Sequence, residues 1–186
     1  MNDQAVSVET LRRLLLQGGE SAELDYKATL DVAQRGDELE LTKDVAAMLA
    51  KGGHIVVGAQ GDGQPSGRYT RDLAENLDEA RLRPKLERYL APPFSVRTAT
   101  HDVDANVFTV IWIEPSPHGI AVINAIGAYE KDGKQKQVFA PGDVFVRHGT
   151  SSERWNQQDV LALVQRLISM NKEAWLSEHR EDLRRL

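Results

Sequence analysis

The chain has no cysteine, and this absence limits its chemistry. Its 186 residues contain no thiol that could form a disulfide, hold zinc or act as a nucleophile. Any bound metal must therefore be held by oxygen or imidazole ligands. Aromatic residues are scarce at 6%, and Tyr69, Tyr89 and Tyr129 are far apart along the chain. The sequence therefore offers no evident platform for stacking the bases of a single strand.

Long apolar runs are also missing. No stretch reaches the length that spans a membrane, and the N-terminus lacks a basic region followed by an apolar one. We therefore expect a cytoplasmic protein with no membrane partner.

The net charge of −5 argues against a protein that coats nucleic acid non-specifically, because such proteins carry a basic excess. A local basic segment is nevertheless present between residues 68 and 97. Acidic residues are interleaved with it, so it is either the salt-bridged face of a helix or a patch that contacts phosphates. Its basic residues are Arg68, Arg71, Arg81, Arg83, Lys85, Arg88 and Arg97.

The first part of the chain alternates helical and strand patterns. Apolar stripes followed by paired glycines predict helices over residues 8–17 and 37–50. Residues 22–27 alternate apolar and charged side chains, which predicts a strand with one buried face. Residues 54–59 are largely apolar, which predicts a central strand buried on both faces. A turn rich in glycine follows at residues 61–63.

The rest of the chain combines further helices and strands. The helical pattern of residues 71–90 is interrupted by Pro84, which either kinks one helix or starts a second. Residues 157–186 are also helical in pattern. Strands are predicted over residues 95–100, 106–115, 119–127 and 142–149, with a polar loop over residues 130–137.

These elements predict an α+β fold. We expect a mixed, mostly antiparallel sheet of five to six strands with helices packed on it. Residues 1–168 form the predicted domain, and residues 169–186 form a helical extension. Trp175 and Leu176 are the bulky apolar pair of that extension, which is either a cap on the domain or a contact in a homodimer.

Four motifs, in this order, resemble the Schlafen AlbA-like domain family, which is described as DNA-binding. They are "GGES" at residues 18–21, "LDYK" at residues 24–27, "AKGGHIVVGAQGDGQPSG" at residues 50–67 and "FVRHGTSS" at residues 145–152. The resemblance extends from Leu11 to Leu167. This sequence departs from the family in lacking an asparagine before the glycine pair and in carrying Asp25 and Tyr26 where glutamate and phenylalanine are usual.

The resemblance implies a metal site. Members of the family that act as nucleases use three acids to hold a divalent metal that cleaves RNA, and these positions correspond to Glu20, Asp25 and Asp62. Carboxylate oxygens suit Mg²⁺ or Mn²⁺, which polarise a phosphodiester. Lys27 shares a strand face with Asp25, where it can neutralise a phosphate oxygen. In the alternative interpretation, Glu20 and Asp62 are turn residues and Asp25 pairs with Lys27.

Further residues are candidates for contact with nucleic acid. A guanidinium and hydroxyls within a turn suit a phosphate, which points to Arg147 together with His148 and Ser151. Arg68 and Arg71 of the basic segment are further candidates. The alternative for Arg147 is a structural role, tying the last strand to the C-terminal helix.

Two functions follow. The first is nucleic-acid binding by a Schlafen AlbA-like domain that also acts as a metal-dependent endoribonuclease on structured RNA such as tRNA or rRNA. The second is a non-catalytic DNA-binding or regulatory interaction module. The sequence does not distinguish RNA from DNA.

Overall fold

The computed structural model describes residues 3–91, 93–117 and 119–178. The chain divides into two compact units, residues 1–154 and residues 155–186, which are described separately. The second unit contains α5 (Gln157–Glu178), as its helical pattern predicts. The end of the predicted extension, residues 179–186, lies outside the described residues. The predicted domain boundary at residue 168 and the homodimer stay predictions. No helix in the described part of the chain is long and apolar enough to cross a membrane.

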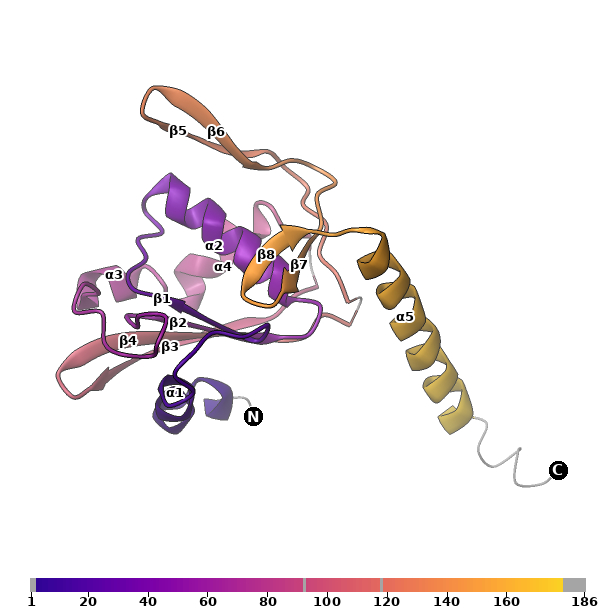
Figure 1. Ribbon diagram of the computed structural model, residues 1–186, viewed down its shortest axis with the longest axis horizontal. Helices are drawn as coiled ribbons and strands as arrows, with labels where there is room; N and C mark the ends of the chain where they lie inside the picture. The colour runs from indigo at the N-terminus through magenta and orange to yellow at the C-terminus, as the bar shows by residue number, and fades with distance from the viewer. Residues whose placement is uncertain (1–2, 92, 118, 179–186) are drawn as a thin grey trace. The chain divides into compact units, whose positions relative to one another are not determined.

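The first unit is built on a mixed sheet of four strands (Figure 1). These are β1 (Leu24–Lys27), β2 (Gly53–Val57), β3 (Val96–Val103) and β4 (Asn106–Ile113), in the spatial order β1-β2-β4-β3. β1 and β2 are parallel, and the other pairs are antiparallel. The parallel pair is joined through α2 (Arg35–Met48), because a tight turn cannot connect parallel strands. The predicted α+β class and mixed, mostly antiparallel sheet are confirmed.

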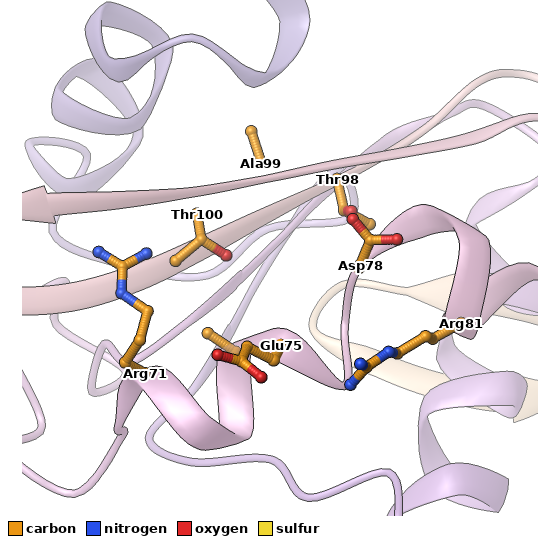
Figure 2. A pocket seen from close by; sticks show the side chains of 8 residues that line it. Arg71, Glu75, Asp78, Arg81, Thr98, Ala99 and Thr100 are labelled. Atoms are coloured by element: carbon orange, nitrogen blue, oxygen red, sulfur yellow. The ribbon is translucent and has the colours of Figure 1, made fainter.

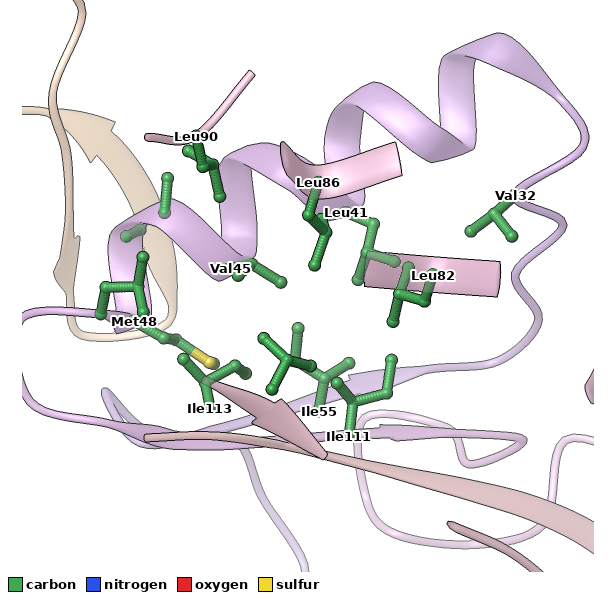
Figure 3. Close-up of a cluster of buried hydrophobic side chains, with 14 of the residues drawn as sticks. Val32, Leu41, Val45, Met48, Ile55, Leu82, Leu86, Leu90, Ile111 and Ile113 are labelled. Atoms are coloured by element: carbon green, nitrogen blue, oxygen red, sulfur yellow. The ribbon is translucent and has the colours of Figure 1, made fainter. Parts of the chain in front are cut away.

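Helices cover both faces of this sheet. α2 and α4 (Glu79–Glu87) pack over one face, where the larger apolar core lies (Figure 3). η1 (Asp3–Val6) and α1 (Val8–Leu15) cover the other face and bury a second apolar cluster. Side chains alternate along β2, so Ile55 belongs to the first cluster and Val56 to the second. This explains why Ile55, Val56 and Val57 of this strand are consecutive apolar residues.

An aspartate cap separates the two helices that follow residue 70. α3 (Arg71–Glu75) ends before a short turn, and the backbone N–H of Ala80 donates to Oδ1 of Asp78 at 2.9 Å. This carboxylate caps α4. Pro84 lies inside α4, so the second helix begins at the aspartate cap and not at the proline.

Two predictions for the later strands were wrong. The polar loop predicted over residues 130–137 is part of a hairpin formed by β5 (Gly127–Lys131) and β6 (Lys134–Phe139). Its turn residues, Asp132 and Gly133, have φ of 53° and 70°, which suits a tight hairpin turn. Most of the strand predicted over residues 119–127 is instead an irregular segment with isolated bridges at Val122 and Ile123, and only its last residue, Gly127, belongs to a strand.

A second hairpin precedes the end of the first unit. It consists of β7 (Phe145–His148) and β8 (Ser151–Arg154). Both hairpins form sheets of two strands of their own and lie against α2. For this reason the main sheet has four strands rather than the predicted five to six.

Candidate nucleic-acid interface

Asp25 lies in a buried network of charged side chains between β1, α2 and β7. Asp25 and Lys27 share a face of β1, and Lys27 Nζ lies 2.9 Å from Asp25 Oδ2 and 2.7 Å from Oδ2 of Asp44 in α2. From β7, both terminal nitrogens of Arg147 donate to Asp25 Oδ1 at 3.3 Å. The side chains of Asp25 and Arg147 are only 6% and 4% exposed. Asp25 is therefore held by two cations inside the fold.

The network is balanced in charge, with two cations and two carboxylates. Burial lowers the pKa of Lys27, but the carboxylates of Asp44 and Asp25 outweigh burial and raise that pKa overall. Arg147 also donates to Ser152 Oγ and to the Ser21 carbonyl oxygen, each at 3.2 Å. These contacts use Arg147 to fasten the β7–β8 hairpin to β1, and they leave its guanidinium turned away from solvent.

Glu20 and Asp62 lie near Tyr26. Glu20 Oε1 accepts a hydrogen bond from the backbone N–H of Tyr26 at 3.4 Å, and Asp62 Oδ1 accepts one from the N–H of Gln64 at 3.0 Å. Burial raises the pKa of Tyr26, and the carboxylates of Glu20 and Asp62 raise it further. The Tyr26 hydroxyl donates to the Leu14 carbonyl oxygen at 2.6 Å.

The family resemblance assigns Glu20, Asp25 and Asp62 to a metal. Tyr26 belongs to the apolar cluster on the α1 face of the sheet, whereas Asp25 points to the α2 face, because neighbouring side chains of a strand alternate. Within the ranges that the structure describes, no group of three or more His, Cys, Asp or Glu side chains could hold a metal ion. The metal site at Glu20, Asp25 and Asp62 therefore stays a prediction.

Most basic side chains of the segment between residues 68 and 97 are bound to carboxylates or carbonyl oxygens within the fold. Lys85 Nζ donates to the Val32 carbonyl oxygen at 3.0 Å. Arg68 is exposed, and its backbone N–H donates to Ser66 Oγ at 3.2 Å. The salt-bridged interpretation therefore accounts for most of this segment. Its ion pairs are Arg71–Asp102, Arg83–Glu87, Arg88–Glu38 and Arg97–Glu79.

A shallow groove of about 450 Å³ lies between α3, the start of α4 and β3. Figure 2 shows Arg71 and Arg81 on its opposite sides, with Glu75 between them. Asp78 and the hydroxyl of Thr100 complete the polar lining. Since the two guanidiniums are matched by two carboxylates, the groove has no excess of positive charge with which to attract a phosphate.

The β7–β8 hairpin carries the other two residues predicted to contact nucleic acid. His148 and Ser151 are directly opposite each other at the end of the hairpin. His148 Nδ1 lies 3.2 Å from Glu153 Oε2, and Ser151 is exposed. Both residues are thus nearer the surface than Arg147, which the prediction grouped with them.

The structure adds an exposed basic feature that the sequence analysis interpreted as a loop. The β5–β6 hairpin, called the β5–β6 arm below, carries Lys131, Lys134 and Lys136, all exposed. The sequence contained a signal for it, because Asp132-Gly133 between two short polar runs is typical of a two-residue hairpin turn. The signal was missed because the runs flanking it have no apolar face.

Comparison with family models agrees with the motif resemblance. A family model described as Schlafen, AlbA_2 matches residues 20–156. A comparison with curated proteins gives no match. Among solved structures, the DIP2311 protein from Corynebacterium diphtheriae is 13% identical to the chain, with a TM-score of 0.49. That match covers 80% of this chain and 26% of the other, so the chain spans about a quarter of the length of that protein.

Proposed function

The chain belongs to the Schlafen AlbA_2 family, and from this premise we propose that it binds nucleic acid through the phosphate backbone. The match covers the main sheet and both hairpins, and every candidate residue from Glu20 to Ser151 lies within it. Membership of this family is consistent with a nucleic-acid-binding domain. The proposal is therefore a binding function, whether the nucleic acid is RNA or DNA.

One observation favours binding without cleavage. Asp25, the acid in the strand motif, already has Lys27 and Arg147 as partners within the fold. A metal ion that took this carboxylate would leave the buried Arg147 guanidinium without its carboxylate partner and Lys27 with Asp44 alone, and removing one partner of a buried ion pair is costly. The network therefore supports a structural role for Asp25.

The binding proposal is tested by fluorescence anisotropy with labelled duplex DNA and a labelled structured RNA. Contacts to phosphates release counterions, so the logarithm of the association constant should fall linearly as the logarithm of salt concentration rises. Saturable binding with such a slope is the expected result. Failure to bind either probe at low salt, or an affinity that does not change with salt, would overturn the proposal.

A divalent-metal-dependent endoribonuclease acting on structured RNA is the second candidate. It is favoured by the fact that Glu20 and Asp62 share a neighbourhood, since both act on the pKa of Tyr26. We nevertheless expect no cleavage, because the Asp25 carboxylate is already paired within the fold. Incubation of the purified protein with tRNA or rRNA and Mn²⁺ tests this expectation. Cleavage that needs Mn²⁺ and is lost in Asp62→Asn, a change that retains the turn, would establish the second candidate instead.

A further inference from the structure

The β5–β6 arm is held at its base by close packing. A Cβ added at Gly127 would lie 2.2 Å from the Phe139 ring, and one added at Gly36 of α2 would lie 3.1 Å from the Tyr129 ring. Phe139 also packs edge-on against Tyr89, with ring centroids 5.2 Å apart. These contacts leave little space at the base, so the arm is fixed to the core at that end. Figure 1 shows the hairpin on the α2 side of the sheet.

Pairing between β5 and β6 sorts the side chains of the arm onto two faces. Directly opposed residues share a face, and so do residues two apart along a strand. Lys131 is paired with Lys134, and Tyr129 with Lys136, so these four residues lie on one face. Glu130 is paired with Gln135 on the other face. The arm therefore presents three lysines and a tyrosine together.

This lysine face turns toward α2 at the base of the arm. Lys136 Nζ lies 3.1 Å from Oε1 of Glu40 in α2. Lys43, one helical turn further along α2, pairs with Oε2 of the same carboxylate. Glu40 is thus shared by two lysines, and the surface around it keeps an excess of positive charge.

Lys131 and Lys134 extend this positive surface to the end of the arm. Both are exposed, and they face each other directly across the hairpin. Two like charges in this position destabilise a strand pair. Throughout the described ranges, neither lysine has a carboxylate within ion-pair distance, although Asp132 lies in the adjoining turn. Such an uncompensated local cost is expected where an external anion is the partner.

We propose that Lys131 and Lys134 bind the phosphate backbone of double-helical DNA, with the β5–β6 arm lying in the major groove. The proposal rests on the proposed nucleic-acid-binding function and assigns it a surface and a partner. A phosphate between the two ammonium groups removes their repulsion and forms charge-assisted hydrogen bonds with both. Lys136 and Lys43 continue the same surface toward the core, where further phosphates would follow.

The shape of the arm favours duplex DNA over duplex RNA. The major groove of B-form DNA is wide enough to admit a ribbon of two strands. The corresponding groove of A-form RNA is deep and too narrow for side chains to enter. Single strands are disfavoured as well, because the lysine face offers one aromatic residue, Tyr129, and its ring packs against α2.

The test compares three proteins: the parent, the double variant Lys131→Gln with Lys134→Gln, and the control Arg12→Gln with Lys51→Gln. The control removes the same charge from two exposed positions outside the arm. Anisotropy is measured with three probes of about 20 units: duplex DNA, duplex RNA of the same sequence and single-stranded DNA. For the arm variant we expect roughly tenfold weaker binding to duplex DNA and a salt slope flatter by about one to two units. The control should retain both values.

Each outcome decides a separate point. If the parent binds no probe, the proposed function itself fails. If the parent binds and the arm variant binds equally well, or if arm variant and control weaken alike, the arm is not the contact surface and the proposal is overturned. If the lysine-dependent loss occurs with duplex RNA rather than duplex DNA, the assignment to DNA is overturned. Thermal melting adds a readout, because relief of the lysine repulsion should leave the arm variant at least as stable as the parent.

Discussion

The two hairpins of the protein use their basic residues in opposite ways. In the β7–β8 hairpin, Arg147 is buried and paired with Asp25, and it fastens the hairpin to the main sheet. In the β5–β6 arm, Lys131 and Lys134 are exposed and oppose each other, without a carboxylate partner among the residues described. Apolar and aromatic packing holds that arm at its base, together with the ion pair between Lys136 and Glu40.

The difference shows that the position of a charge matters more than its presence in a motif. Arg147 lies in one of the four motifs of the family resemblance, yet its guanidinium is taken up by internal contacts. Lys131 and Lys134 of the arm belong to no such motif and remain available to a ligand. The electrostatic potential at the surface of this protein therefore depends on which charged side chains are unpaired, since a buried ion pair contributes little to it.

The largest expected effect comes from breaking the Asp25 network. Asp25→Asn removes the carboxylate that neutralises the buried Arg147 guanidinium, and loss of one partner of a buried ion pair typically costs about 3–5 kcal/mol. We expect a loss of this size in the free energy of unfolding, measured by urea denaturation. The control is Asp62→Asn at an exposed turn, where the change should stay within about 0.5 kcal/mol.

An Asp25→Asn protein as stable as the parent would contradict the structural role of this network. An Asp25→Asn protein more stable than the parent would favour a metal site instead, because carboxylates gathered for a metal repel one another when no metal is bound. Mn²⁺ sharpens the distinction. It should not raise the melting temperature of the parent, since a rise requires a ligand that the native state binds.

A smaller effect is expected at the base of the β5–β6 arm. The added methyl of Gly127→Ala would overlap the buried Phe139 ring, and overpacking of this kind costs roughly 1–3 kcal/mol. Gly19→Ala is the matched control, because a Cβ there meets no atom within 4 Å. Equal unfolding free energies for the two variants would show that the arm is not packed as described.

The smallest effect concerns acid and the β7–β8 hairpin. Arg154 donates two hydrogen bonds of 2.9 Å to Asp143, and this guanidinium holds the pKa of Asp143 below its ordinary value. A lowered pKa means that the contribution is present at neutral pH and is lost as the pH falls below about 4. For a pair near the surface it amounts to less than about 1 kcal/mol.

Unfolding measured between pH 5 and pH 3 should therefore show a steeper loss of stability for the parent than for Asp143→Asn. The variant keeps a polar side chain but has no carboxyl to titrate at this position. Parallel curves for the two proteins would mean that the ion pair with Arg154 contributes nothing to the acid response.

Apolar patterns in the sequence correctly predicted the helices and strands whose apolar side chains are buried. The apolar stripe of residues 8–17 corresponds to α1, and the apolar run of residues 54–59 corresponds to β2 between two cores. The turn between β3 and β4 was also predictable. Its residues Asp104 and Ala105 have φ of 49° and 64°, and the segment around them is rich in turn-forming residues.

The wrong predictions concern segments where buried residues do not form a strand or where strand residues are exposed. Ala121 and Ile123 are buried without belonging to a strand, so an apolar run alone misidentified the segment. Residues 130–137 form strands although nearly all are exposed, because the turn and the backbone hydrogen bonds define that hairpin. The site depends on contacts over long distances. Asp25 and Arg147 are 122 residues apart, and no local spacing encodes their pairing.

The most direct test of the account is an NMR titration of isotope-labelled protein with duplex DNA. If the arm is the contact surface, the amide signals around Lys131 and Lys134 should shift or broaden first. Signals of β1 and β7, where Asp25 and Arg147 are paired, should stay unchanged. Perturbation that centres on Asp25, Arg147 or the Asp62 turn, with the β5–β6 arm unaffected, would contradict it.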